Sequence, residues 1–414
     1  MGAAASMQAA AAVANASSGA AMDMQAAARG LAQTAAAPSL KIVHVFRAPF
    51  GGLFRHVLDV ARGQAARGHR VGLIADSTTG GQRADAALAE LAPQLALGLE
   101  RIAMARQLRP SDFAALGATA RRIGLLAPDV IHGHGAKGAA LARLAPSAPN
   151  AIRVYTPHGG SLFYGPGTLG GGFYRGLEWL LKWRTDLFLF ESAYVAGLFR
   201  SAIGRPPATM RVIHNGVSDA EFAPVTAAGG ATDLVSIGEL RQIKAFDVLI
   251  AALAVLKESG RPVSATIAGE GPLAPELKAQ AERLKVGELV RFVGYRPARE
   301  AFAMGRLLVM TSRSESLPYV LLEGAAAGMP ILATRVGGIP EIFGPQAGNL
   351  IDPDNVDALA AAIGVALDAP ERIEAVAQVV RSRVRGEFSL PAMVERGLAA
   401  YREAIALRKL SRFT

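Results

Sequence analysis

The chain has 414 residues, 51% of them hydrophobic, which is enough to fill two cores of ordinary size, so we expect two globular domains. The absence of cysteine excludes disulfides, thiolate metal sites and a cysteine nucleophile. The formal charge of +10 favours anionic partners, but the sequence has no basic tract interleaved with aromatic residues and no zinc-finger spacing, so we expect no nucleic-acid partner.

Residues 1–38 are rich in alanine and lack the basic start of a signal peptide, which predicts a low-complexity, disordered tail. No later run approaches the roughly 20 uncharged apolar residues that a membrane-spanning helix needs. We therefore expect a cytoplasmic protein that does not span a bilayer, in agreement with the lack of cysteine.

From residue 40 onward, short β-branched runs alternate with helical patterns, which is typical of βαβ units and parallel sheets. The first six runs predict strands over residues 40–46, 70–75, 129–134, 151–156, 186–190 and 211–217. After a linker at about 222–232, the pattern restarts and predicts strands over 234–240, 263–269, 289–295, 307–312 and 329–335. The fold class is therefore α/β, with Rossmann-like doubly wound domains at 39–225 and 226–388 and a ligand cleft between them.

Two turns at the ends of predicted strands carry candidate ligand-binding residues. Gly51 and Gly52 open a helix, where bare backbone can approach an anion, although a plain glycine turn explains them equally well. Arg241 and Lys244 lie three residues apart on another turn, where two cations can grip a diphosphate. The alternative for this second turn is a solvated basic loop.

Three histidines follow predicted strands. We expect the strand to turn His132 and His134 to opposite faces, which argues against a metal site, and we interpret His132 as a core or loop residue. His158 stands between Pro157 and Gly159, and we predict that its ring projects into the cleft. A purely structural histidine at the end of a strand is the alternative.

The run "SRSESLPYVLLEGAAAGMP" places two glutamates around the start of a predicted helix. Ser316 is the expected cap, Pro318 suits the first turn and Gly328 ends the helix. Glu315 then lies on the loop before the helix and Glu323 in its second turn. Carboxylates accept hydrogen bonds from hydroxyls, and the helix tip between them offers N–H groups to phosphate, so a nucleotide sugar fits this arrangement.

The run E-S-L-P-x-x-L-L-E-G-x-x-x-G-x-P-I-x-A-T-x-x-G-G-x-x-E resembles the donor-site signature of the retaining glycosyltransferases of family four. The likeness extends over residues 40–410. It implies the GT-B fold of two facing Rossmann-like domains, with a C-terminal helix within 389–414 that packs back on the first domain.

The resemblance also implies roles for individual residues. It implies that Glu315 and His158 are the catalytic pair. Glu315 would contact the hydroxyls of the transferred sugar, and His158 would lie by the anomeric centre. The donor-binding residues that it implies are Gly51, Gly52, Arg241, Lys244, Ser316, Leu317 and Glu323. Many members carry the arginine two residues earlier, where this chain has Glu239. Glu341 matches an acidic position of the family, although a glutamate at a helix N-terminus needs no ligand to explain it.

The expected activity is retaining transfer of a hexose from a UDP- or GDP-sugar to a lipid-linked or saccharide acceptor, in the synthesis of cell-surface polysaccharide, lipopolysaccharide or glycolipid. A nucleotide-sugar epimerase and a non-catalytic nucleotide-sugar-binding protein are the alternatives. We expect no cofactor and no metal, because the cations on the turn can neutralise the diphosphate. Asp352 and Asp354 have the spacing of a metal motif, but Asp354 or Asn355 is better interpreted as a helix cap.

A predicted helix in the first domain has the composition of a membrane-surface helix. Its apolar side chains recur at helical spacing, and aromatic and basic residues surround them. The residues concerned are Phe173, Tyr174, Arg175, Leu177, Trp179, Leu180, Leu181, Lys182, Trp183 and Arg184. The helix either contacts an anionic membrane peripherally or packs on its own domain, and the sequence leaves both readings open.

Overall fold

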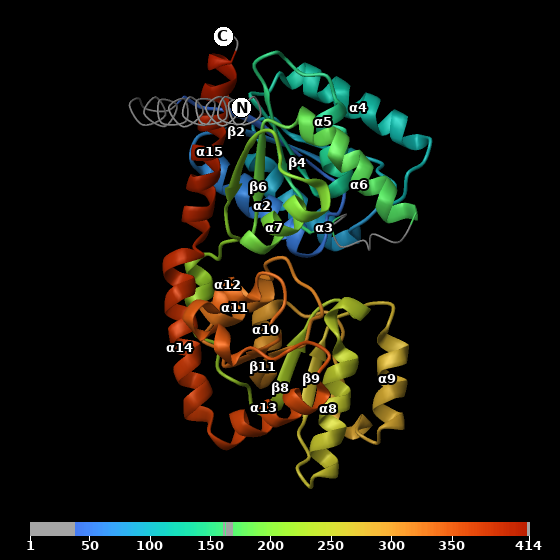
Figure 1. Ribbon diagram of the computed structural model, residues 1–414, viewed down its shortest axis with the longest axis vertical. Coiled ribbons are helices and arrows are strands. Elements are labelled where there is room, and N and C mark those ends of the chain that lie inside the picture. The colour runs from blue at the N-terminus through green and yellow to red at the C-terminus, as the bar shows by residue number, and fades with distance from the viewer. Residues whose placement is uncertain (1–37, 160–161, 163–168, 412–414) are drawn as a thin grey trace, which may run out of the picture. The chain divides into compact units, whose positions relative to one another are not determined.

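The first half of the chain forms a seven-stranded sheet in the computed structural model, which describes residues 38–159, 162 and 169–411 (Figure 1). The strand order is β3-β2-β1-β4-β5-β6-β7, and the pairs from β3 to β6 are parallel. The strands are β1 (Lys41–Phe46), β2 (Arg70–Asp76), β3 (Leu99–Ile102), β4 (Val130–His134), β5 (Ile152–Thr156), β6 (Leu187–Phe190) and β7 (Thr209–Val212). The helices between them are α2 (Gly51–Ala66), α3 (Gly81–Leu91), α4 (Ser111–Leu126), α5 (Gly135–Leu144), α6 (Leu169–Leu181) and α7 (Ala193–Ile203).

The sequence predicted six of these strands and missed β3. This strand has four residues, lies at the edge of the sheet, and carries Glu100 and Arg101 in its centre. Charged side chains are common on edge strands, where they interrupt the apolar run by which a buried strand is recognised. The last strand, predicted over residues 211–217, is displaced as well as shorter, since β7 begins at Thr209 and ends at Val212.

The second sheet has the order β10-β9-β8-β11-β12, and all four of its strand pairs are parallel. Its strands, all five of them predicted, are β8 (Thr232–Ile237), β9 (Ala265–Ala268), β10 (Val290–Phe292), β11 (Gly305–Met310) and β12 (Ile331–Ala333). The helices around it are α8 (Phe246–Glu258), α9 (Ala274–Arg283), α10 (Ala298–Phe302), α11 (Tyr319–Ala326), α12 (Ile339–Phe343), α13 (Val356–Asp368) and α14 (Pro370–Glu387).

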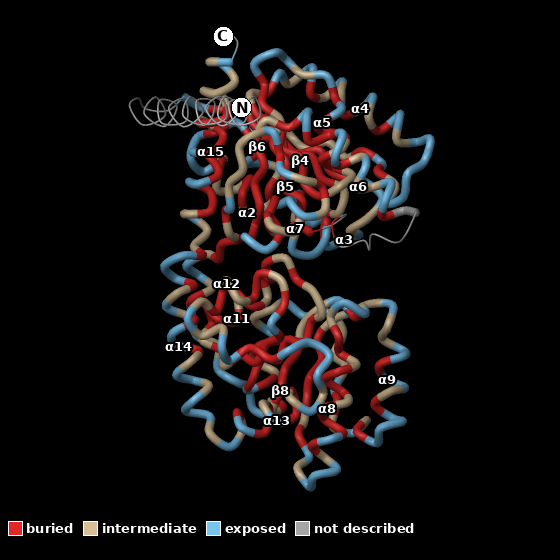
Figure 2. Tube along the Cα trace, viewed as in Figure 1, coloured by how far each residue is buried: buried red, intermediate tan, exposed pale blue. Residues whose placement is uncertain are grey.

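Each sheet is buried on both faces. In the first sheet, Val43, Val45 and Ile131 pack in one apolar cluster, whereas Phe46 and Leu73 pack in another that includes α2. Two further clusters form around the second sheet. Figure 2 shows that buried residues follow the strands within each unit. Burial on both faces explains why these strands are continuous apolar runs and do not alternate.

The contacts divide the chain into two units. Among the described residues, the first lies within 38–189, 200–211 and 394–411, and the second comprises 190–199 and 212–393. The last helix, α15 (Leu390–Leu410), contacts the first unit from Val394 onward, for example where Tyr401 Oη lies 2.7 Å from His132 Nδ1. The predicted tail at 1–38 falls outside the described residues except for its last position.

None of the helices in the described ranges combines the length and the apolar character that crossing a bilayer requires.

Candidate active site

The turn between β8 and α8 carries the two predicted cations of the second unit. It contains a short 3-10 helix, Gln242–Lys244, and Ala245 follows with a φ of 53°. Arg241 precedes the 3-10 helix and is partly exposed, with its guanidinium 3.5 Å from the carboxylate of Glu239. Lys244 ends the 3-10 helix, so both cations lie on one tight turn, as the sequence predicted.

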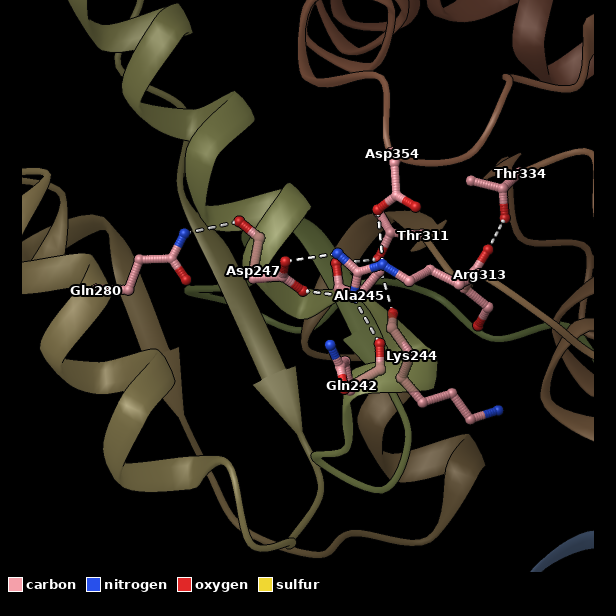
Figure 3. A network of polar contacts seen from close by, with 10 residues as sticks. Gln242, Lys244, Ala245, Asp247, Gln280, Thr311, Arg313, Thr334 and Asp354 are labelled. Atoms are coloured by element: carbon pink, nitrogen blue, oxygen red, sulfur yellow. Dashed lines mark hydrogen bonds and ion pairs between the residues drawn. The ribbon is translucent and has the colours of Figure 1, made fainter. Parts of the chain in front are cut away.

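Arg313, which follows β11, fastens this turn (Figure 3). Its Nη1 donates to the carbonyl of Gln242 at 2.6 Å, and its Nη1 and Nη2 donate to the carboxylate of Asp247 at 3.0 and 2.6 Å. Thr311 Oγ1 donates to the carbonyl of Lys244 at 3.0 Å. The backbone of the turn is therefore held by side chains from a neighbouring strand end, and the ammonium of Lys244 extends away from this network (Figure 3).

Glu315 lies on the loop between β11 and α11 and is 9% exposed. Its Oε1 accepts hydrogen bonds from Lys244 Nζ at 2.5 Å and from Ser312 Oγ at 2.6 Å. Lys244 and Glu315 are 71 residues apart in the chain, yet they form a charge-assisted pair. The structure thus joins two residues that the sequence had singled out separately.

The loop of Glu315 packs against two consecutive glycines. Gly337 has a φ of 59°, and a Cβ there would lie 1.7 Å from the carbonyl oxygen of Glu315. A Cβ on Gly338 would lie 2.2 Å from the carbonyl oxygen of Ser316, to which the Gly338 N–H donates at 2.9 Å. Only glycine permits this approach, so the pair fixes the position of the Glu315 backbone.

The start of α11 differs from the prediction. The helix runs over Tyr319–Ala326 and is preceded directly by Pro318, without a side-chain cap, so the predicted cap by Ser316 is wrong. A capping side chain comes from the residue next to the first turn, and Ser316 lies too far upstream. Leu317 is buried in the core, which leaves only its backbone to face a ligand. Glu323 lies in the second turn, as predicted.

Both aspartates of the Asp-x-Asp sequence before α13 lie close to arginine side chains. Asp354 Oδ1 accepts a hydrogen bond from Arg313 Nε at 2.6 Å, and Asp352 lies 3.7 Å from Arg335. The side chain of Asn355 accepts from a backbone N–H of the first turn of α13, so Asn355 is the cap of this helix. The prediction of a cap at this place is confirmed for Asn355 and not for Asp354.

Glu341 joins α12 to the start of α7. Its carboxylate accepts hydrogen bonds from the N–H groups of Ala193 and Tyr194, each at 2.9 Å, and lies 2.9 Å from His214 Nε2. Burial acts to raise the pKa of Glu341, but the hydrogen bonds from His214 and the two N–H groups outweigh it and lower the pKa. Glu341 therefore caps a helix other than its own.

The candidates of the first unit lie at the start of α2 and after β5. Gly51 and Gly52 are exposed, and Gly51 has a φ of 66°. His158 has a φ of 54°, a conformation that costs a residue other than glycine about 1 to 3 kcal/mol. Its ring packs edge-on against His56 of α2, with the ring centroids 4.9 Å apart. The glycine turn and His158 are therefore linked through α2.

A cluster of histidines lies beneath His158. It contains five of the seven histidines, namely His44, His56, His132, His134 and His158. His132 and His134 both face this cluster, so the expectation of opposite faces is wrong, because side chains two residues apart in a strand point to the same face. Ring nitrogens of His44, His132 and His134 lie within 4.8 Å of one another, and imidazole is a common transition-metal ligand.

Burial keeps four histidines of this cluster neutral. It lowers the pKa of His44 to about 4, although the hydrogen bond to Gln64 acts in the opposite direction. Burial, followed by repulsion from the neighbouring imidazoles, also holds the pKa values of His132, His134 and His158 well below the ordinary value. These four imidazoles are therefore neutral at pH 7.

Two family models match adjacent parts of the chain. The model of glycosyl transferases group 1 matches residues 217–383, and the model of glycosyltransferase family 4 matches residues 50–221. The chain belongs to the family-four glycosyltransferases. The match to glycosyltransferase family 4 includes every strand of the first sheet except β1. The match to glycosyl transferases group 1 includes all strands of the second sheet and the donor-site signature.

Relatives of this glycosyltransferase have been described in several organisms. The glycogen synthase of Mycobacterium tuberculosis (strain CDC 1551 / Oshkosh) is 29% identical over 366 residues, which cover 82% of this chain and 87% of the relative. The GDP-mannose-dependent alpha-(1-6)-phosphatidylinositol monomannoside mannosyltransferase of Mycolicibacterium smegmatis is 32% identical over 212 residues, or 46% of this chain and 55% of the relative.

A solved structure shares the fold. Anabaena Alr3699/HepE in complex with UDP-glucose superposes with a TM-score of 0.69 at 19% sequence identity, covering 86% of this chain and 98% of that one. The glycosyltransferase described here therefore has the GT-B fold, which confirms the predicted fold class.

Sequence reasoning missed the residues that hold the candidate site in place. Arg313 precedes Glu315 by two residues, but no local pattern shows that it reaches Asp247, 66 residues away. Asn215, whose Nδ2 donates to the carbonyl of Leu317 at 2.8 Å, gave no signal either. The histidine cluster did give a signal in the sequence, because His132 and His134 have the spacing of two residues on the same face of a strand.

We expect Gly337→Ala to displace the Glu315 loop. The new Cβ would overlap the Glu315 carbonyl, and a left-handed alanine costs about 1 to 3 kcal/mol. The melting temperature should therefore fall, by about 2 to 4 °C for each kcal/mol lost, and donor binding should weaken. Thermal unfolding and calorimetry with UDP and GDP measure both effects. Gly348→Ala is the control, because no other atom lies within 4 Å of its Cβ position. Equal behaviour of the two variants would contradict the role of Gly337.

The neutral histidines should make stability depend on pH. An unfolded histidine has a pKa of about 6.5, whereas the pKa of folded His44 is about 4, so between these values only the unfolded chain binds the proton. The contribution of each such histidine to the free energy of unfolding is fully present above pH 6.5. It is lost as the pH falls toward 4, by about 1.4 kcal/mol per pH unit. Melting temperatures at pH 7.5 and 5.5 test this, and equal values would contradict it.

Proposed function

We propose that the protein transfers a hexose from a UDP- or GDP-sugar to a hydroxyl acceptor, with retention of the anomeric configuration. Its membership in family four supports the reaction class. The observation that carries the donor assignment is the contact of Lys244 with Glu315, which sets a cation for phosphate beside a carboxylate for sugar hydroxyls. Arg241 lies on the same turn as Lys244 and supplies a second cation.

In this mechanism the protein positions the donor and stabilises charge. Arg241 and Lys244 neutralise the diphosphate, Glu323 holds the ribose, and Glu315 binds hydroxyls of the transferred sugar, to which we also assign His158. The bond between the anomeric carbon and the phosphate oxygen breaks while the acceptor oxygen attacks from the same face. The acceptor proton passes to the departing phosphate oxygen, so no protein nucleophile is needed.

The acceptor is proposed to be lipid-linked or a saccharide. The names of the two relatives above, a glycogen synthase and a phosphatidylinositol monomannoside mannosyltransferase, describe one polysaccharide and one glycolipid product. We accordingly place the reaction in the synthesis of cell-surface polysaccharide, lipopolysaccharide or glycolipid. A screen of UDP- and GDP-sugars against lipid-linked and soluble acceptors identifies both substrates, and an epimer formed without acceptor would instead indicate an epimerase.

The two glutamates of the signature should separate binding from turnover. Glu323→Ala is expected to weaken UDP or GDP binding by about 1.5 to 3 kcal/mol, because the ribose hydroxyls lose a charged partner. Glu315→Ala should leave nucleotide binding nearly intact and lower turnover of the sugar donor. Calorimetry and a transfer assay measure the two effects, with the exposed Glu374→Ala as control. The assignment is wrong if both variants bind and turn over donor as the parent does.

Transfer should not require a divalent metal. The carboxylates of Asp352 and Asp354 lie against Arg335 and Arg313, and the cations of the β8 turn are available for the diphosphate. We therefore expect activity to survive excess EDTA and Asp352→Asn to behave like the parent. Loss of activity on chelation, with recovery on adding Mg²⁺ or Mn²⁺, would overturn this proposal.

Helix α6 has a buried and an exposed face. On the buried face Glu178 accepts hydrogen bonds from Arg143 Nη2 at 3.0 Å and from Tyr155 Oη at 2.7 Å. Leu181, which the sequence placed in the same stripe as the exposed side chains, is buried. The large apolar side chains of α6 and the following turn that are more than half exposed are Phe173, Trp179, Leu180 and Trp183. The helix thus packs on its own domain and still presents an aromatic face.

We propose that this aromatic face contacts an anionic membrane peripherally, because tryptophan suits the lipid interface. Lys182 and Arg184 donate to backbone carbonyls, so the attraction rests on the apolar side chains and on the net charge of +10. We expect co-sedimentation with vesicles containing phosphatidylglycerol at low salt, weakened by Trp179→Gln with Trp183→Gln. Tyr295→Gln, another exposed aromatic, is the control. A parent protein that stays in the supernatant would refute the contact.

A further inference from the structure

A chain of hydrogen bonds runs from Gln64 to His158 through the interior of the first unit. Gln64 Oε1 lies 2.9 Å from His44 Nε2, and His44 Nδ1 lies 2.9 Å from His134 Nε2. His134 Nδ1 lies 3.2 Å from His158 Nε2. Gln64, His44 and His134 are buried, whereas His158 is partly exposed. The chain therefore connects the last turn of α2 to a residue that can meet a ligand.

The protons in this chain can be ordered from one end to the other. A neutral imidazole has one N–H donor and one acceptor nitrogen, and the carbonyl oxygen of Gln64 can only accept. His44 must then donate from Nε2 and accept at Nδ1 from His134 Nε2. His134 in turn accepts at Nδ1 from His158 Nε2. His158 consequently carries its proton on Nε2, and its Nδ1 is an unprotonated acceptor.

A second branch orients the amide of Gln64. Gln64 Nε2 donates to Tyr401 Oη at 3.5 Å, Tyr401 Oη lies 2.7 Å from His132 Nδ1, and His132 Nε2 lies 2.9 Å from Thr156 Oγ1. Burial raises the pKa of Tyr401, so the phenol keeps its proton and can donate it to His132. The phenol oxygen then accepts from the Gln64 amide nitrogen, which leaves Oε1 directed at His44.

The same histidines are better explained by this chain than by a metal. In a metal site the lone pairs of three nitrogens converge on one point, whereas here ring nitrogens of His44 and His134 face each other at hydrogen-bond distance. Both nitrogens of His44, His132 and His134 already have partners. His134 also directly precedes α5, where the positive end of the helix dipole disfavours a cation.

We propose that Gln64, acting through His44 and His134, fixes the tautomer of His158 so that His158 Nδ1 accepts a hydrogen bond from a hydroxyl of the donor sugar. This inference rests on the proposed function, which sets His158 beside the transferred sugar. Gln64, His44 and His134 are positioning residues, because they act on the sugar only through His158. Their role accounts for a row of polar side chains in the core of a sheet that could have been apolar.

The test is the tautomer itself, observed by NMR of ¹⁵N-histidine-labelled protein at pH 7.5 without any donor. The His158 signals are assigned with His158→Gln. We expect a protonated Nε2 and an unprotonated Nδ1 at His44, His134 and His158 in the parent. Gln64→Met removes the anchor and should give mixed tautomers at His158, whereas Gln64→Glu retains an acceptor and should preserve the parent pattern. Gln82→Met, at an exposed position on α3, is the control.

A protonated Nδ1 at His158 in the parent would overturn the inference, as would binding of added Zn²⁺ at His44, His132 and His134. In the transfer assay we expect Gln64→Met to lower turnover by about tenfold or more, as for other outer partners that fix a histidine tautomer, with nucleotide binding unchanged. Turnover equal to the parent would contradict the positioning role. Because the spectrum is recorded without donor, it stands even if the protein transfers no sugar, so the two proposals fail separately.

Discussion

Parallel strands bring their carboxyl ends to the same edge of a sheet, and most candidate residues of each unit lie on the turns that follow these ends. In the second sheet β8 pairs with β11, so the turn after β8 meets the loop after β11, and Lys244 reaches Glu315. In the first sheet β1, β4 and β5 are neighbours, which gathers the start of α2, His134 and His158. The strand order thus decides which distant residues share a site.

The loops of the site are held by contacts to their backbone. Arg313 donates to the carbonyl of Gln242, and Gly337 allows the carbonyl of Glu315 to pack against the chain without a Cβ between them. Such contacts hold the chain that carries Lys244 and Glu315 in place, and the two side chains form a charge-assisted pair with each other. Pre-set geometry of this kind is what positioning and charge stabilisation require of a protein.

The first unit has a polar layer inside an otherwise apolar core. His44, His132 and His134 occupy strand positions at which apolar residues would usually be buried, and α2 and α15 supply Gln64 and Tyr401 as their partners. A buried polar group is costly unless it is hydrogen-bonded, and these imidazoles are neutral and paired. The last helix therefore supplies a hydrogen-bonding partner to the polar layer beneath His158.

The sequence by itself determined the two α/β sheets, nearly all of their strands, and the residue types that suit a nucleotide sugar, because periodicity and turn chemistry are local properties. It misjudged the charged edge strand β3 and the start of α11 after Pro318, which depend on neighbours. The shared face of His132 and His134 was misjudged although the period of two in a strand encodes it. Only the tertiary structure decided that Arg313 clamps Asp247 and that Gln64 lies at the far end of a chain from His158. These pairings follow from strand order and from which helix covers which face, and no run of adjacent residues encodes either.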